Sequence, residues 1–331
     1  VAASALDPVI ENIAFDVWST TKGVTSMLAG RAEQLGYLDL DDPIGPYLAT
    51  QYPMDAEHAA ITIRQLLTQS SGLHLAWPPE LTGYPDDEVR YTLDLPFDNP
   101  RGTHFEYGQT TVTLLARVIE AAVGQDLQEF AHEQLFAPIG IDRLPTWGRD
   151  RAGNTIGHAH LEITPIEMAR IGHMALHGGA WRGAQLISAD YIEQAQTPSP
   201  TNPYYGYLLW SNQSDHGQTV AFPGAREITG RHFFDSAPPD LYMFVGFRDQ
   251  LILIIPSLDM VVVRTGEPGN SSGNTQQMLT ADSGAWHHEF FRMLMRGVED
   301  QQIPDPGPYA WDSGEPVVVD IDHFLWVPPL P

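Results

Sequence analysis

The hydrophobic period of this 331-residue chain changes twice along its length. Residues 7–18 are typical of a turn and a short strand, helical patterns and loops dominate from about residue 40 to 205, and strand patterns return after that. The order of strand, helices, further strands and a closing helix predicts a sheet domain that is interrupted by a helical insertion, which is an α+β organisation.

This organisation divides the chain into three expected parts. The sheet domain takes residues 1–40 and 205–298, the helical insertion takes 41–204, and an extension rich in Pro, Asp and Gly takes 299–331. We expect helices after Ser19 and over 61–73, 110–125, 127–141, 164–179 and 283–298, and strands over 206–211, 232–236, 241–247 and 251–266.

Several residues mark where these helices begin and end. The hydroxyl of Ser19 is available to cap the first amides of the helix that follows it. Thr164 and Glu167 form a helix-start pattern, and Gly72 and Gly124 are typical of helix ends.

Charge and composition restrict the partners that the chain can have. A net charge of −25 would repel a polyphosphate, so we expect no nucleic-acid partner. There is no apolar run of membrane-spanning length, so we expect no membrane span. Cysteine is absent, which excludes disulfides, thiolate nucleophiles and cysteine metal sites. We expect no cofactor, and the oligomeric state is left open.

One lysine stands among sixteen arginines, and it lies three residues after a serine. The spacing Ser19-x-x-Lys22 places both side chains on one face of a helix, one turn apart. A serine hydroxyl needs a nearby base to become a nucleophile, and a buried lysine can give up its proton whereas arginine cannot. The alternative interpretation is a helix-capping serine followed by a surface lysine.

Five segments resemble, in their expected order, the serine β-lactamase-like family, which includes class C β-lactamases, penicillin-binding carboxypeptidases, esterases and 6-aminohexanoate-oligomer hydrolases. They are WSTTKGVTSMLAGRAEQLGYLDLDDPIGPYL, ITIRQLLTQSSGL, FEYGQTTVTLLARVIEAAVGQ, HLEITPIEMARIGHMALHGGAWRGAQLIS and FVGFRDQLILIIPSLDMVVV, together covering about residues 15–297. The resemblance implies a β-lactamase-like fold, in which an antiparallel sheet is flanked by helices and carries an inserted, mostly helical domain.

The resemblance also implies catalytic roles. Tyr107 matches the tyrosine of the family's Tyr-x-Asn motif and would lie near Ser19 and Lys22. A nearby ammonium would depress the pKa of the Tyr107 phenol, so that it acts as a base and later activates water. The oxyanion hole would be formed by the backbone amides of Ser19 and Phe247.

Two motif positions depart from the family pattern. Gln109 stands where the family has asparagine, and Phe244 replaces the lysine or histidine of the third motif, Phe244-Val245-Gly246. An aromatic ring cannot bind a substrate carboxylate, which argues against penicillin and D-Ala-D-Ala substrates. Gln109, Phe244, Gly246 and Arg248 are the expected substrate-binding residues of this region, with Arg248 equally well explained as a surface residue.

The expected function is therefore that of a serine esterase or amidase acting through an acyl-enzyme on Ser19, with a small carboxylic ester or amide as substrate. The alternatives are a catalytically silent binding protein of the same fold and a D-Ala-D-Ala carboxypeptidase or β-lactamase. Many relatives are secreted or periplasmic, which favours that compartment only weakly. Relatives also have several strands before the nucleophile helix, where this chain has eighteen residues; the run VVVDI at 317–321 is a candidate for a missing strand.

Other patterns have simpler interpretations. Residues 269–273 fit Gly-x-Ser-x-Gly but follow a polar loop rather than a strand, and would need His287, His288 or His323 as a base. His158 and His160 have no carboxylate cluster near them in the sequence to complete a metal site. Aromatic residues suited to lining a substrate cleft, or equally to packing in the core, are Trp77, Tyr204, Tyr205, Tyr207 and Trp210.

Overall fold

The computed structural model describes residues 12–75, 85–220, 225–266, 284–299, 301 and 303–309. Its helices are α1 (Thr20–Gln34), α2 (Gly45–Leu48), α3 (Ala56–Ala59), α4 (Ile63–Leu67), α5 (Glu88–Asp94), α6 (Thr110–Val123), α7 (Leu127–Ala131, continued by a π-turn to Phe136), α8 (Pro165–Leu176), α9 (Ala189–Gln196) and α11 (Gly284–Arg296). Its strands are β1 (Phe15–Asp16), β2 (Thr146–Trp147), β3 (Leu161–Ile163), β4 (Ala180–Trp181), β5 (Ala184–Gln185), β6 (Trp210–Ser211), β7 (His216–Val220), β8 (Ala225–Thr229), β9 (Tyr242–Gly246), β10 (Gln250–Ile255) and β11 (Met260–Arg264).

The main sheet is antiparallel and has the strand order β11-β10-β9-β6. Its central strand β10 reads QLILII and is buried throughout, as a strand covered on both faces must be. In register, Ile252 lies opposite Phe244 on β9 and Val263 on β11, so these three side chains share one face. The expected α+β class is confirmed.

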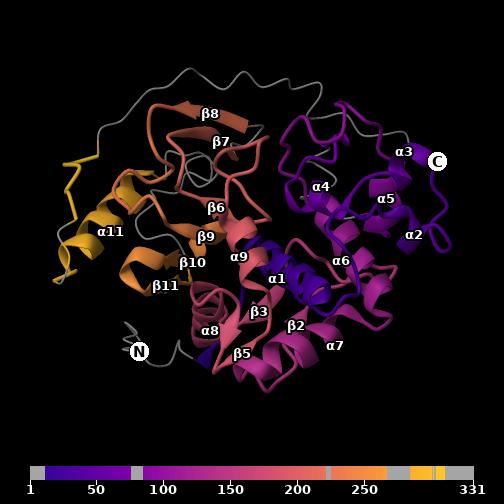
Figure 1. Ribbon diagram of the computed structural model, residues 1–331, viewed down its shortest axis with the longest axis horizontal. Coiled ribbons are helices and arrows are strands. Elements are labelled where there is room, and N and C mark those ends of the chain that lie inside the picture. The colour runs from indigo at the N-terminus through magenta and orange to yellow at the C-terminus, as the bar shows by residue number, and fades with distance from the viewer. Residues whose placement is uncertain are drawn as a thin grey trace.

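Helices cover both faces of this sheet (Figure 1). On the face of Phe244, its ring lies against Gly23 of α1, and Ile252 approaches Gly172 of α8. On the opposite face, the guanidinium of Arg264 lies over the ring of Trp286 in α11, 4.8 Å from the ring centroid. The sheet is therefore the middle of three layers, and α1 is the helix that joins it to the rest of the molecule.

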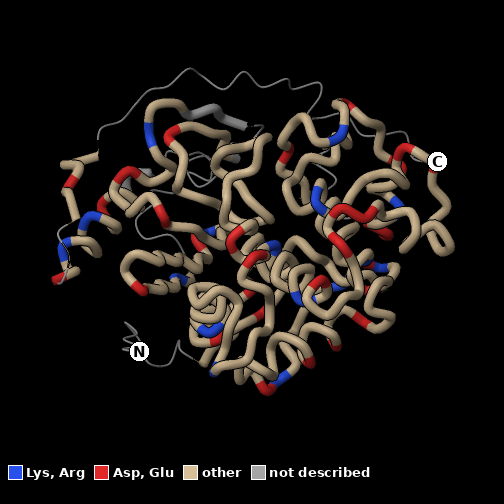
Figure 2. Tube along the Cα trace, in the orientation of Figure 1, with Lys and Arg blue, Asp and Glu red and all other residues tan. Residues whose placement is uncertain are grey.

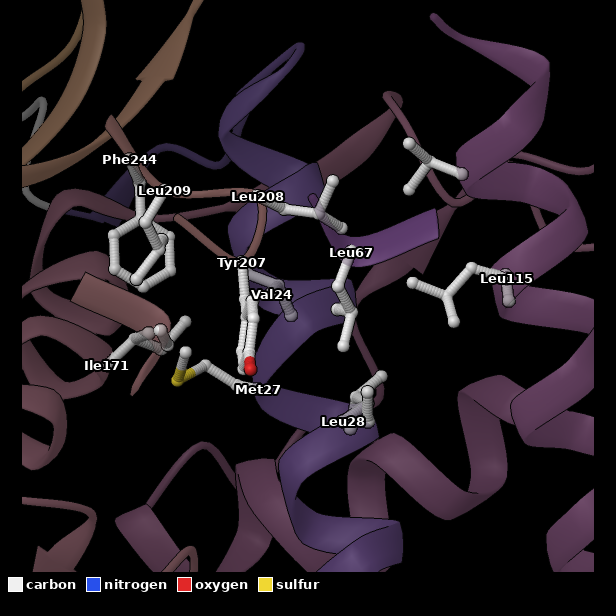
Figure 3. Close-up of a cluster of buried hydrophobic side chains, with 14 of the residues drawn as sticks. Val24, Met27, Leu28, Leu67, Leu115, Ile171, Tyr207, Leu208, Leu209 and Phe244 are labelled. Atoms are coloured by element: carbon white, nitrogen blue, oxygen red, sulfur yellow. The ribbon is translucent and has the colours of Figure 1, made fainter. Parts of the chain in front are cut away.

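Helix α1 is the centre of the core, and twelve of its fifteen residues are buried. Figure 3 shows Leu67 of α4 and Leu115 of α6 on one side of this helix, with Ile171 of α8 and Phe244 of β9 on the other. Small residues let these elements come close: an added Cβ at Gly30 would lie 2.5 Å from a ring carbon of Tyr191. Packing around α1 consequently fixes where its N-terminal residues lie.

A second, three-stranded sheet has the order β1-β3-β2 and holds the chain just before α1. Phe15 pairs with Ile163, and the amide of Val17 donates to the carbonyl of Leu161 at 2.9 Å. The segment before the first helix is thus a strand, as expected, although it pairs with β3 rather than with the main sheet. The candidate strand at 317–321 lies outside the described residues.

Most expected elements are present, with three differences. Residues 232–236, expected as a strand, form a turn in which the amide of His232 donates to Asp235 Oδ1 at 2.8 Å. The helix expected over 61–73 ends at Leu67, and the hairpin β7–β8 and helices α5 and α9 were not expected. Gly124 ends α6 in a left-handed conformation, and Thr164 with Glu167 forms a complete capping box on α8, both as expected.

The expected domain boundary at residue 204 stays a prediction. Helix α8 lies inside the expected helical insertion, yet it packs against β10 and β11 of the main sheet. Acidic residues are spread along the described part of the trace with basic residues between them, as Figure 2 shows. None of the helices in the described part of the chain is both long and apolar enough to cross a membrane.

Gly23→Ala tests the packing contact between α1 and Phe244 of the main sheet. A Cβ at this position would lie 2.1 Å from Cδ1 of Phe244, so the substitution should lower the free energy of unfolding by about 1–3 kcal/mol through overpacking. Without such a clash, alanine would stabilise a helix interior by about 1 kcal/mol relative to glycine. A decrease in the free energy of unfolding would therefore indicate overpacking. Urea unfolding measures it, and the cost should shrink in a Phe244→Leu background; an equal cost in both backgrounds would contradict the assignment.

Candidate active site

Ser19 lies at the start of α1, directly after a strained turn. Trp18 has a left-handed backbone with φ of 48°, which a residue with a side chain rarely adopts. The carboxylate of Asp16 accepts a hydrogen bond from the Trp18 amide at 2.9 Å and stabilises this turn. Ser19 itself is half-buried, and its hydroxyl makes no capping hydrogen bond with the described backbone. The expected use of this hydroxyl as a cap is therefore wrong, and the hydroxyl meets Lys22 instead.

Lys22 is buried, with a relative exposure of 1%. Its ammonium donates to Ser19 Oγ at 3.1 Å, to Gln109 Oε1 at 2.5 Å and to the backbone carbonyl of His158 at 3.4 Å. These acceptors come from α1, from the N-cap of α6 and from the loop before β3. Burial rules out the surface-lysine interpretation, and the contact with Ser19 brings together the pair that the sequence predicts.

Tyr107 lies on the stretch before α6 and reaches the same pair. Lys22 Nζ lies 4.7 Å from the centroid of the Tyr107 ring, and the phenol shares a hydrogen bond with the side chain of Ser19. Trp210 and Tyr205 enclose the ring, with centroids 5.7 and 6.0 Å away. Burial raises the pKa of Tyr107 to about 12, while the hydrogen bond from Ser19 acts in the opposite direction.

This value corrects the expectation that Lys22 depresses the pKa of Tyr107. The ammonium lies over the ring face, and the apolar surroundings of the phenol favour its neutral form. At neutral pH the phenol is therefore protonated and can donate a hydrogen bond.

The two departures from the motif pattern have clear structural consequences. The side-chain oxygen of Gln109 is used to hold Lys22, at 2.5 Å. Phe244 is 1% exposed and fills the space beside Gly23, so its expected contact with substrate is wrong. Gly246 is required by close approach, because a Cβ there would lie 2.2 Å from the Val17 carbonyl oxygen. Trp77 lies outside the described residues.

The turn after β9 lies beside the start of α1. The ring of Phe247 packs edge-on against Trp18 with centroids 5.4 Å apart, and a Cβ at Gly246 would lie 3.0 Å from the amide nitrogen of Thr20. Arg248 is exposed, and its guanidinium lies 5.7 Å from the centroid of the Phe247 ring. Arg248 and Asp249 both have left-handed backbones, with φ of 60° and 58°.

Buried polar groups hold this strained turn. The Gln250 side chain donates to the Arg248 carbonyl at 3.1 Å, and Arg264 donates to the Asp249 carbonyl at 2.9 Å. The hydroxyl of Thr20 donates to the Gln250 carbonyl at 2.5 Å, which ties the turn directly to α1. Asp249 Oδ1 also lies 3.2 Å from Nε2 of His287 in α11. No motif in the sequence marks these contacts.

His158 and His160 have separate acidic partners. His158 Nε2 lies 3.3 Å from Glu88 Oε2, whereas His160 Nδ1 lies 2.7 Å from Asp16 Oδ2. Each histidine therefore has a carboxylate partner that comes from a distant segment of the chain. Within the described residues, no group of three or more His, Cys, Asp or Glu side chains is arranged to hold a metal.

The His160–Asp16 pair should make stability depend on pH. The hydrogen bond to Asp16 raises the pKa of His160 above its ordinary value, so the folded state binds the proton more tightly than the unfolded state. The contribution is complete below about pH 6.5 and is lost as the pH rises through the raised pKa. We expect about 1 kcal/mol or less, since both side chains are 28% exposed.

Urea unfolding of wild type and His160→Gln at about pH 5.5 and pH 8.5 tests this sign. The wild type should be the more stable protein at the lower pH, and the difference should shrink at the higher pH. A difference that grows with pH would contradict it.

Known proteins resemble this chain in sequence and in fold. The chain is 24% identical over 188 residues to a 6-aminohexanoate-dimer hydrolase of Paenarthrobacter ureafaciens; this match takes in 57% of the chain and 45% of the relative, so it spans about half of that protein. Two solved structures share the fold: a putative 6-aminohexanoate-dimer hydrolase from Bacillus anthracis and a putative β-lactamase from Bacteroides dorei. The first has a TM-score of 0.65 at 16% identity and covers 88% of this chain and 76% of its own. The second has a TM-score of 0.63 at 19% identity and covers 86% of each chain.

At these identities the structural likeness concerns the fold, which is β-lactamase-like. The family model for β-lactamases matches residues 2–265, which include Ser19, Lys22, Tyr107 and the turn after β9. Because that match takes in most of the sequence, the chain belongs to the β-lactamase family.

Proposed function

We propose that this protein is a serine hydrolase that forms an acyl-enzyme on Ser19 and acts on a small carboxylic ester or amide. The observation that carries the proposal is the buried amino group of Lys22, 3.1 Å from the hydroxyl of Ser19. A buried lysine beside a half-exposed serine has little value as a surface charge, and it matches the need of a serine nucleophile for a base.

Acylation follows from the direction of the Ser19–Lys22 hydrogen bond. When Lys22 is protonated it donates to Ser19 Oγ, and when it is neutral the hydroxyl donates to Nζ. In the neutral form, Ser19 Oγ attacks the substrate carbonyl carbon while its proton passes to Lys22 Nζ. The carbonyl oxygen gains a negative charge, which the backbone amides of Ser19 and Phe247 would stabilise as the oxyanion hole.

Tyr107 supplies a proton rather than removing one in the first step. Its phenol is protonated at neutral pH and is hydrogen-bonded to Ser19, so it can donate to the leaving alcohol or amine and recover a proton from Lys22. Water then attacks the acyl carbonyl carbon, its proton passes to the Lys22–Tyr107 pair, and Ser19 Oγ leaves with a proton. The free acid is released and the starting state is restored.

The substrate class is inferred from what stands at the third motif. Phe244 is buried against α1, so no cation from this position faces a substrate carboxylate. This favours esters or amides with little negative charge over penicillins. One relative is a 6-aminohexanoate-dimer hydrolase, which agrees with an amide among the candidate substrates.

Ser19→Ala should abolish turnover of p-nitrophenyl acetate and butyrate, with a loss of about 10³-fold or more, because no other group can form the acyl-enzyme. Ser26→Ala is a matched control: Ser26 lies in the same helix, and its hydroxyl is 3.0 Å from that of Tyr191. The control should keep its turnover. Equal turnover by wild type and Ser19→Ala would overturn the proposal, and mass spectrometry after a phosphonate probe should find the label on Ser19.

Nitrocefin should be hydrolysed poorly by the same preparation that turns over p-nitrophenyl butyrate. The reason is the loss of the cationic or histidine side chain at position 244, which cannot be replaced by a ring in the core. The measurement is the ratio of kcat/KM for the two substrates. Rapid nitrocefin turnover would instead favour the β-lactamase or carboxypeptidase alternative.

A further inference from the structure

Three ionisable side chains are buried together behind Ser19. Lys22, Glu88 and His158 are 1%, 0% and 2% exposed. They come from α1, from the first turn of α5 and from the loop before β3, which are far apart in the sequence. Lys22 donates to the backbone carbonyl of His158 at 3.4 Å, and the His158 ring lies 3.3 Å from the Glu88 carboxylate.

The Glu88 carboxylate is held in an ionised form. The hydroxyl of Thr113 in α6 donates to its Oε2 at 2.6 Å. Burial acts to raise the pKa of Glu88, but His158 and the hydrogen bonds from His158 and Thr113 outweigh it and keep that pKa below its usual value. Burial also lowers the pKa of His158, and the charge of Lys22 lowers it further. The cluster thus combines one acid with two bases, and the charge of Lys22 disfavours a proton on His158.

A buried ammonium is costly unless a negative charge compensates it. Glu88 is the one acid among these three residues, and it is linked to Lys22 through His158. We propose that Glu88 and His158 are positioning residues: Glu88 supplies the counter-charge of Lys22, His158 holds the Glu88 carboxylate, and together they set the pH range in which the lysine can accept the Ser19 proton. This rests on the proposed function, in which Lys22 is the base.

The other ionisable groups near the cluster lie farther out or stay neutral. Tyr107, from the stretch before α6, is protonated at neutral pH. His160 acts on both Glu88 and His158, and it is paired with Asp16 of β1. At the N-terminus of α5, the Asp150 carboxylate accepts a hydrogen bond from the backbone amide of Glu88 at 2.9 Å. Asp87, the N-cap of α5, accepts from Asn154. All of these remain in the variants below.

The single lysine makes a direct test possible. In protein labelled with ¹³C,¹⁵N-lysine, the one side-chain signal is that of Lys22, and its titration gives the pKa of Lys22 without any substrate. Glu88→Gln removes the counter-charge and should lower the pKa of Lys22 by about one unit or more. An unchanged midpoint would overturn the proposal.

Glu167→Gln is the matched control. Glu167 is also a buried glutamate in an ion pair, 2.6 Å from Arg143, but it belongs to the capping box of α8. Its loss should reduce stability and leave the Lys22 midpoint in place. An equal shift in this control would show that any lost buried acid moves the lysine, which would also overturn the proposal.

The wild-type protein gives a second measurement that does not depend on the folding of Glu88→Gln. As the pH falls, the Glu88–His158 pair takes up a proton, and the Lys22 signal should report this as a second, smaller step. That step should vanish in His158→Asn. A wild-type titration with a single step would count against the proposal as decisively as an unchanged midpoint.

Catalysis provides the last readout. The acid limb of p-nitrophenyl acetate turnover should move to lower pH in Glu88→Gln, by the same amount as the Lys22 midpoint. If Ser19→Ala retained full turnover, the proposed function would fail although the lysine titration still tested the counter-charge. If the midpoint moved and the acid limb did not, the electrostatic part would stand and its role in the reaction would be refuted.

Discussion

The arrangement of the site depends on one buried amino group. An ammonium without water must have its hydrogen bonds satisfied by the protein, and Lys22 donates to Ser19, Gln109 and the His158 carbonyl. Each acceptor belongs to a different part of the chain, so α1, the start of α6 and the loop before β3 can only be assembled together. The hydrogen bonds that make burial of the charge tolerable are the same ones that place the base beside the nucleophile.

The close packing of α1 explains both what the site contains and what it has lost. Gly23 and Gly246 leave room for the sheet to approach the first turns of the helix, and Phe244 fills that room. A ring at position 244 packs well beside a glycine but cannot carry charge to the site. At the point where β9 passes α1, apolar packing therefore occupies the position at which the family motif has a lysine or histidine.

How far the sequence predicts this protein depends on the range of each interaction. Local signals succeeded: Gly124 ends α6, and Thr164 with Glu167 begins α8. The α+β class and the family also followed, because the order of segments along the chain is itself visible in the sequence. The prediction of a strand at 232–236 was wrong. The aromatic residues of this segment are typical of a strand, but Asp235 accepts a hydrogen bond that closes a turn.

The parts of the site that the sequence did not predict all depend on distant contacts. Glu88 was not expected, since nothing in its neighbourhood shows that α5 places it beside a histidine seventy positions away. The serine hydroxyl was expected to cap the helix, and only burial of Lys22 shows why it does not. Gln109 was expected to face substrate, but its side chain holds Lys22. A motif position reveals the residue type, whereas packing determines which partner that residue contacts.

These contacts also explain why a chain that uses arginine for its other sixteen basic residues retains one lysine. Arginine stays protonated in proteins, so at position 22 it would leave Ser19 without a base. Burial raises the pKa of Tyr107 to about 12, which keeps its phenol protonated at neutral pH. Lys22 is the group beside Ser19 that can both carry a proton and release it. Under the two proposals made above, the reaction therefore depends on the proton affinity of Lys22 and on the buried carboxylate of Glu88.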